Sequence, residues 1–156
     1  WENVFQIFPQ GEKWLDLGFY VEYEVANQQG SPDALEWKIL AEKNVGPLTF
    51  TVNPIFEKEL GANATKSTEF KYAARAKWRF MPELEPAIEA YGDLGEISHI
   101  DPSSEQRHQI GPVLLGKFGL GNASALKYEA GYLFGLTRDG SPDGAFKWLL
   151  EFEHHF

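Results

Sequence analysis

The feature that most constrains the fold is a two-residue period of large apolar side chains, which is clearest in the last thirteen residues, 144–156. Apolar residues fill nearly all of one set of alternate positions there, and the charged residues Lys147, Glu151 and Glu153 all lie in the other set. Successive side chains of a β-strand point to opposite sides, so this segment predicts a strand with one apolar and one charged face. The first set comprises Phe146, Trp148, Leu150, Phe152 and Phe156, with His154 as its polar member.

The same period recurs along most of the chain and predicts an all-β protein. We expect about eight strands, at 14–26, 35–43, 48–59, 69–80, 84–94, 108–120, 125–137 and 144–156, and a further strand or part of one at 1–8. Segments of about 10 to 13 residues are long enough to cross a bilayer at a tilt. Pro54, Pro86 and Pro112 fall inside these segments. Because proline cannot donate to a ladder, we expect a bulge or a strand break at each.

The connections between these segments alternate in length. Short connections are predicted at 44–47, 81–83 and 121–124, and longer ones at 27–33, 60–68, 95–107 and 138–143. In an up-and-down sheet all the short turns then lie at one end and all the long loops at the other. That arrangement is typical of a transmembrane β-barrel with tight turns on one side of the membrane.

Composition narrows the class of protein. The 156 residues predict a single domain, 1–156, and the absence of cysteine excludes a disulfide framework. A formal net charge of −9 argues against nucleic-acid binding, and no apolar run is long enough for a transmembrane helix. Aromatic residues make up 15% of a chain whose mean hydropathy is only −0.36, which suits a barrel with a polar interior and an apolar outer belt.

The end of the chain resembles the closing strand of bacterial outer-membrane β-barrel proteins. The resemblance depends on Trp148, Leu150, Phe152 and the terminal Phe156, and His154 departs from it where an aromatic residue is usual. It implies that these four residues form the insertion signal that the barrel-assembly machinery reads in Gram-negative bacteria. It also implies location in the outer membrane, contact with lipid, and a fold of the small-barrel or porin-like type.

Together, the pattern and the resemblance predict an antiparallel up-and-down transmembrane β-barrel with about eight strands. Chains of this kind usually carry further strands upstream, so the chain is also compatible with the C-terminal part of a barrel with about ten or twelve strands. A closed sheet is expected because hydrocarbon cannot satisfy open strand edges.

The charged positions are expected to face the lumen. The predicted lumen charge network contains Glu22, Glu24, Lys71, Arg75, Lys77, Arg79, Glu89, Glu129, Glu151 and Glu153. In an eight-stranded barrel side chains fill the interior, and buried charges must pair. We therefore favour an internal ion-pair network that plugs the barrel. The alternative is a wider, water-filled conduit for the passive passage of small solutes.

Other functions receive less support from the sequence. Carboxylate pairs such as Glu22 and Glu24 arise by chance in so acidic a face, and no nucleophile motif or cofactor motif occurs, so we expect neither catalysis nor a cofactor. His99 and His108 flank the longest predicted loop, but solvated histidines are favoured there over a metal site. The alternative function is a soluble, lipocalin-like ligand-binding barrel, which would keep its apolar face inside.

Overall fold

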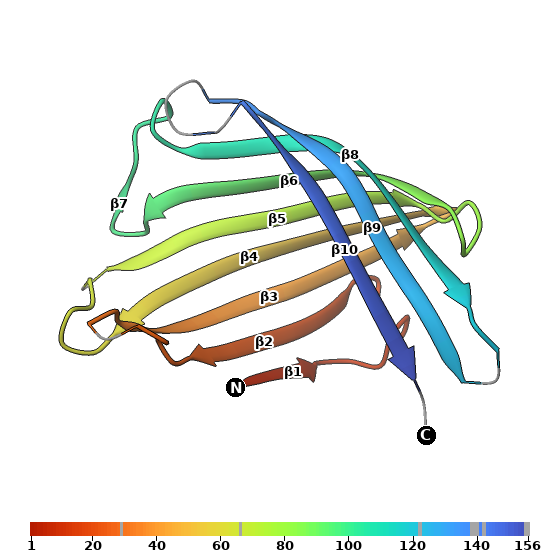
Figure 1. Ribbon diagram of the computed structural model, residues 1–156, viewed down its shortest axis with the longest axis horizontal. Helices are drawn as coiled ribbons and strands as arrows, with labels where there is room; N and C mark the ends of the chain where they lie inside the picture. The colour runs from red at the N-terminus through yellow and green to blue at the C-terminus, as the bar shows by residue number, and fades with distance from the viewer. Residues whose placement is uncertain (29, 66, 122, 138–140, 142, 155–156) are drawn as a thin grey trace.

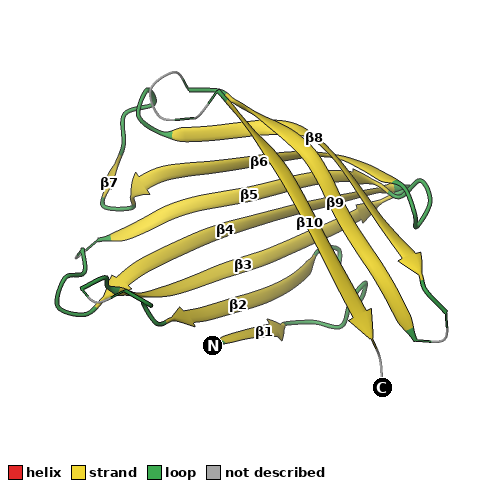
Figure 2. Cartoon of the chain, viewed as in Figure 1, coloured by secondary structure: helices red, strands yellow, loops and turns green. Residues whose placement is uncertain are grey.

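The computed structural model describes residues 1–28, 30–65, 67–121, 123–137, 141 and 143–154. These residues form one antiparallel sheet of ten strands (Figure 2). The strands are β1 (Glu2–Gln6), β2 (Asp16–Glu24), β3 (Asp33–Val45), β4 (Leu48–Leu60), β5 (Thr68–Trp78), β6 (Glu85–Glu96), β7 (His99–Ile100), β8 (Arg107–Gly119), β9 (Ser124–Gly135) and β10 (Gly144–His154). No helix in the described part of the chain is long and apolar enough to span a membrane.

The predicted all-β fold is confirmed, and the period-two segments coincide with the main strands. Each strand boundary that the structure describes lies within two residues of the boundary expected from the sequence. The exception is β7, a two-residue strand that pairs with β6 inside the segment predicted as the longest loop. Alternation located the long strands because it extends over many residues, whereas two residues are too few to carry a period.

Neighbours in the sheet follow the order of the sequence: β1-β2-β3-β4-β5-β6-β8-β9-β10, with β7 beside β6. From β2 onward the connections alternate as predicted, with short ones at 46–47, 79–84 and 120–123 at one end of the sheet. The longer ones, 25–32, 61–67, 97–106 and 136–143, lie at the other end. Gly46 has a φ of 55°, a left-handed conformation that permits the two-residue connection between β3 and β4.

The sheet is strongly curled but open. In Figure 1, β8, β9 and β10 turn across the layer formed by β2 to β6, so that β10 passes over it diagonally. β1 and β10 are the two edges, and no pairing joins them in the described residues. The antiparallel sheet is therefore established by the structure, while the closed barrel expected from the sequence is not formed by these strands alone.

The bulge or strand break expected at each of the three prolines is wrong, because β4, β6 and β8 continue through them without a shift of register. β3 and β4 keep one register on both sides of Pro54, and β8 and β9 keep one register on both sides of Pro112. Pro86, the second residue of β6, pairs with Leu114 without a shift. A residue of an antiparallel strand points its N–H and its C=O to the same neighbouring strand. A proline therefore weakens the pairing with one neighbouring strand and leaves the pairing with the other intact.

The buried side chains lie on the concave side of the curled sheet, here called the inner face. They are Thr49, Ala87, Glu89, Val113, Leu115, Ala125 and Leu133. Cross-strand pairs place Ala87 opposite Val113 and Glu89 opposite Gly111, so apolar and charged residues share this face. The opposite side, here called the outer face, carries most of the large apolar side chains.

Candidate functional site: the charged inner face

The outer face is apolar and exposed. Phe19, Trp78, Leu150 and Phe152 retain 36%, 46%, 52% and 63% of their accessible surface. A large contiguous apolar surface is unusual for a protein surrounded by water and marks an interaction with lipid or with another protein. Three residues of the predicted insertion signal, Trp148, Leu150 and Phe152, lie on this face of β10, and Phe156 lies outside the described residues.

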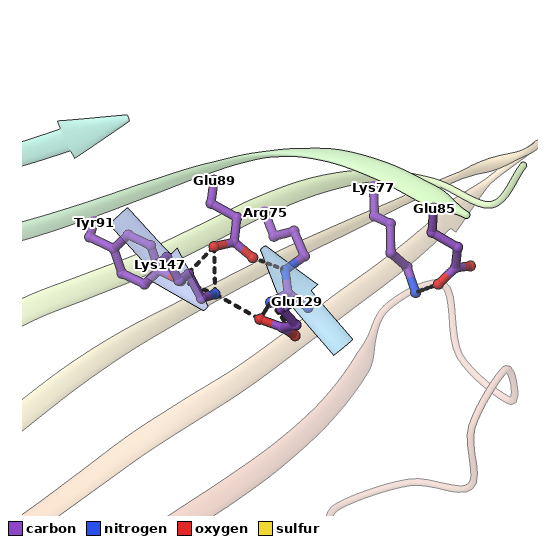
Figure 3. Close-up of polar contacts among 7 residues, drawn as sticks. All are labelled: Arg75, Lys77, Glu85, Glu89, Tyr91, Glu129 and Lys147. Atoms are coloured by element: carbon purple, nitrogen blue, oxygen red, sulfur yellow. Dashed lines mark hydrogen bonds and ion pairs between the residues drawn. The ribbon is translucent and has the colours of Figure 1, made fainter. Parts of the chain in front are cut away.

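Four charged residues meet on the inner face and are here called the quartet: Arg75, Glu89, Glu129 and Lys147 (Figure 3). Arg75 Nε donates to Glu89 Oε1 at 2.5 Å, and Arg75 Nη2 donates to Glu129 Oε1 at 3.1 Å. Lys147 Nζ lies 2.7 Å from Glu89 Oε2 and 2.8 Å from Glu129 Oε2. Two cations and two carboxylates thus alternate, so the cluster is electrically neutral.

Glu89 is the most buried member of the quartet, with only 1% of its side chain exposed. The hydroxyl of Tyr91 donates to Glu89 Oε2 at 2.7 Å and also lies 3.0 Å from Lys147 Nζ. A buried carboxylate is tolerated only when cations and hydrogen-bond donors replace the water that it has lost. Arg75, Lys147 and Tyr91 supply those replacements together.

The quartet joins strands that are far apart in the sheet order. Arg75 on β5 and Glu89 on β6 are direct cross-strand partners, so strand register alone places them together. Glu129 on β9 reaches Arg75 on β5, and Lys147 on β10 reaches Glu89 on β6, only because the sheet curls. The quartet therefore fixes the curl as well as the charge balance of the inner face.

Further ion pairs lie on both sides of the quartet along the strands. Toward the short turns, Lys77 Nζ lies 2.7 Å from Glu85 Oε2. Toward the long loops, Lys71 Nζ lies 2.9 Å from Glu57 Oε2 and 2.8 Å from Glu69 Oε2.

A third group joins β8, β9 and β10. Lys127 contacts both Glu151 and Glu153, and Lys117 lies 2.8 Å from Glu153. Four of the residues predicted for the lumen network, Lys71, Lys77, Glu151 and Glu153, thus lie in separate small groups or pairs around the quartet rather than in one continuous network with it.

Three predicted members lie elsewhere. Arg79 follows the end of β5 and donates to Asn44 Oδ1 at 2.7 Å and to the carbonyl of Gly46, so it braces a turn. Glu24 is exposed at the last position of β2. Glu22 accepts a hydrogen bond of 2.6 Å from the hydroxyl of Tyr20.

Strand register places six glutamates directly opposite one another, a feature here called the glutamate row. The row runs across β1 to β6 and consists of Glu2, Glu22, Glu36, Glu57, Glu69 and Glu96. Among the described contacts, Lys38 binds Glu36 at 2.6 Å, and Lys71 binds Glu57 and Glu69. Like charges directly opposite each other are unfavourable, so the row leaves the long-loop end of the inner face strongly negative.

Two of the hollows on the inner face of the described residues differ in charge. A small one of about 80 Å³ is lined by Glu22, Glu24, Ala34, Glu36 and Glu57. A larger one of about 250 Å³ toward the short turns is lined by four cations, Arg75, Lys77, Lys117 and Lys127, together with Glu85, Glu129 and Glu151 among other residues. Since Arg75 lies between Lys71 and Lys77 along β5, the quartet separates an acidic region from a mixed one.

His108 belongs to a polar cluster on the outer face. Its Nδ1 lies 3.1 Å from the hydroxyl of Tyr72, and its Nε2 lies 2.8 Å from Gln106 Oε1. Gly92 lies between the two rings, and a Cβ there would come within 2.0 Å of the Tyr72 ring. No group of three or more metal-ligating side chains occurs in the part of the chain that the structure describes, and His99 is exposed on β7.

Comparisons with protein-family models, curated proteins and solved structures found no match. The interpretation of the site therefore depends on its own geometry. Tyr91, which donates to Glu89 of the quartet, was absent from the predicted network, and Lys147 was expected on the charged face of its strand without being assigned to the network. Both lie at polar positions of an alternating strand, which is the signal that could have included them. Nothing local in the sequence indicates that β10 would reach β6.

Proposed function

We propose that this protein is a bacterial outer-membrane β-barrel protein whose outer face contacts lipid and whose charged inner face lines the lumen. The observation that carries the proposal is the inverted distribution of side chains. Glu89 is 1% exposed on the inner face, while Trp148 is 67% exposed on the outer face. Water would favour the opposite arrangement, whereas hydrocarbon favours this one.

The dimensions and connectivity of the sheet support the same proposal. The strands from β2 to β10, other than β7, have 9 to 13 residues, which suffices to cross a bilayer at a tilt. Short and long connections lie at opposite ends of the sheet. The barrel-assembly machinery would recognise β10 during insertion, and outer-membrane lipid would surround the mature protein.

Inside the barrel, we propose a structural role or the passive passage of small solutes, without catalysis. If the barrel is narrow, the quartet blocks the lumen between the acidic hollow and the mixed hollow. In a wider form, the glutamate row would favour small cations over anions, as rings of Asp and Glu do in cation channels.

The alternative, a soluble lipocalin-like barrel, receives less support. It requires the outer face to be charged and the inner face to be apolar and hollow. Lys147 and Arg75 would then be in solvent, yet both bind the buried Glu89. The exposed outer face would also need another partner to cover it.

Tryptophan fluorescence tests the proposal. Two variants retain a single tryptophan, at Trp148 in the middle of β10 or at Trp14 in the segment before β2, with phenylalanine at the other four positions. Each is reconstituted into vesicles whose acyl chains carry bromine near the middle, and into matched vesicles without bromine. We expect strong quenching of Trp148 and weaker quenching of Trp14, because only the former lies at the depth of the hydrocarbon core.

A soluble barrel would give a different result. It would remain in the aqueous phase, and neither tryptophan would be quenched. A folded protein that needs no detergent and does not bind the vesicles would overturn the proposed function. Conductance of reconstituted protein in planar bilayers then separates an open lumen from a plugged one.

A further inference from the structure

Another hollow on the inner face, of about 470 Å³, lies apart from the two described above. Its lining includes Asp16, Glu42 and Thr51, and strand pairing joins these residues in succession to Arg75 of the quartet. Directly paired residues share one face of a sheet, so this hollow opens onto the same face as the quartet. Small-molecule pockets commonly have volumes of about 300 to 1,000 Å³, so the hollow is large enough for a small organic ligand.

Part of the lining is apolar. Phe8, in the connection between β1 and β2 (Figure 1), is half-buried and lines the hollow, whereas its neighbour Ile7 is 51% exposed. Leu40 on β3 also lines it. Gly18 on β2 is the direct partner of both Gln6 and Leu40 and has no side chain, so the row is open at that position. These residues offer a surface for the apolar part of a ligand.

Two carboxylates give the hollow its charge. Asp16 and Glu42 are direct cross-strand partners, an unfavourable arrangement for like charges. Asp16 Oδ1 accepts a hydrogen bond of 2.6 Å from the backbone N–H of Gly11. Among the described residues, neither carboxylate has an ion pair, and no Lys, Arg or His lines the hollow. A cation in the hollow would therefore relieve their repulsion and gain charge-assisted contacts with both.

The lining also includes an unsatisfied acceptor. Oδ1 of Asn53 is buried without a hydrogen-bond partner, and no other buried side-chain nitrogen or oxygen in the described part of the chain is in this state. Buried polar atoms in native proteins nearly always have a partner, so an unpaired one requires an explanation. A ligand with N–H donors supplies one, because rotation of the Asn53 amide toward the hollow would bring this oxygen to such a donor.

We propose that this hollow binds a small organic ammonium ion. Its N–H donors face Asp16, Glu42 and Asn53, and its apolar part lies against Phe8 and Leu40. A bare Ca²⁺ or Mg²⁺ ion fits less well, because it requires about six or more oxygen ligands and gains nothing from an apolar surface. The hollow is on the concave side of the sheet, so the proposal goes beyond the membrane function and does not depend on what covers the outer face.

Amide chemical shifts of the detergent-folded protein locate the binding, with n-butylammonium as the probe. We expect saturable shifts at residues 16–18, 40–42 and 51–53, and no comparable shifts at residues 22–24 in the acidic hollow. Butyrate carries the opposite charge and should not bind. Tetramethylammonium has the charge without N–H donors, and n-butanol has the apolar part without the charge. Both should bind at least about tenfold more weakly than n-butylammonium, because neither can donate a hydrogen bond from a charged group.

Two matched double variants separate this site from the general negative charge of the inner face. Asp16→Asn/Glu42→Gln removes both carboxylates of the hollow, while the amide oxygen at position 16 can still accept from Gly11. Glu22→Gln/Glu24→Gln removes two carboxylates of the acidic hollow, with the same change of charge. At about 0.1 M salt, the first should weaken n-butylammonium binding at least about tenfold and the second by less than about twofold.

Several results would overturn the proposal. Equal weakening by the two double variants would indicate a general attraction of counterions instead of a site. Equal binding of n-butanol or tetramethylammonium to the unmodified protein, or the absence of saturable shifts with n-butylammonium, would have the same consequence. None of these results affects the quenching of Trp148 by brominated lipid, which tests the membrane function separately.

Discussion

The inner face of this sheet is charged and the outer face is apolar, which reverses the arrangement that is usual for proteins in water. On the inner face, Glu89 loses nearly all contact with solvent and gains two cations and a phenol. On the outer face, Trp148 and Phe152 remain exposed and contact no core. The same alternating strands build both faces. Alternation alone therefore does not tell whether the apolar face or the charged face lies inside the curled sheet. The two possibilities differ in which face becomes concave when the sheet curls.

The charged residues of the inner face occur in two different arrangements, the quartet and the glutamate row. The quartet is neutral and compact because the curl brings Lys147 to Glu89. The glutamate row is a consequence of register and has fewer cations than carboxylates among its described contacts. Substitutions in the quartet and in the row should therefore change the free energy of unfolding in opposite directions.

Removal of one cation should break the balance of the quartet. Lys147→Met leaves the buried Glu89 with Arg75 as its only described cation, and removing one partner of a buried ion pair costs about 3 to 5 kcal/mol. Urea unfolding of the reconstituted protein measures the loss. The control Lys13→Met removes an exposed lysine that pairs with Glu12, and should change stability by less than about 0.5 kcal/mol. Equal effects of the two substitutions would show that the quartet does not hold the curl.

A charge introduced on the outer face should destabilise the protein by an amount that depends on its depth in the bilayer. Leu150→Arg, near the middle of β10, should destabilise the reconstituted protein by about 2 to 4 kcal/mol, the cost typical of arginine at the bilayer midplane. Leu136→Arg, just after the end of β9, should cost only about 0 to 1 kcal/mol, because the proposed function places this position near the membrane interface. Unfolding of both variants from vesicles measures the difference. The absence of any difference would remove the lipid-facing role from this face.

A methyl group between Tyr72 and His108 tests the polar cluster of the outer face. In Gly92→Ala the new Cβ would lie 2.0 Å from Tyr72 Cε1 and 2.8 Å from His108 Nδ1, so the rings must separate. Overpacking of this kind costs about 1 to 3 kcal/mol. Gly119→Ala meets no atom within 4 Å and serves as the matched control, with little change expected. Thermal unfolding of the two variants should differ, and similar melting temperatures would contradict the close approach.

Neutralising one member of the glutamate row should stabilise the protein. Glu22 lies directly between Glu2 and Glu36, so Glu22→Gln removes two like-charge contacts while an amide oxygen can still accept from Tyr20. We expect a gain of about 0.2 to 1 kcal/mol at low salt, with a smaller gain as salt screens the charges. Urea unfolding at two ionic strengths measures it. If the lumen conducts, the same variant should reduce the preference for cations in planar bilayers, and a loss of stability would contradict the repulsion.

The sequence by itself determined the strands, their faces and their order. Side-chain alternation extends over nine or more residues in each of the long strands, and this local property located every long strand and the two sets of connections. The mutual placement of Arg75 and Glu89 also follows from local order, since β5 and β6 are joined by a short turn.

Which charges from distant strands meet depends on the tertiary structure. Lys147 and Glu89 are 58 residues apart, and their contact depends on the curl of the whole sheet rather than on any neighbouring pair of strands. The same curl brings Glu129 on β9 to Arg75 on β5. Alternation specifies the two faces of each strand, but the accumulated twist and curvature of the sheet determine how its distant parts approach one another, and that information is not local in the chain.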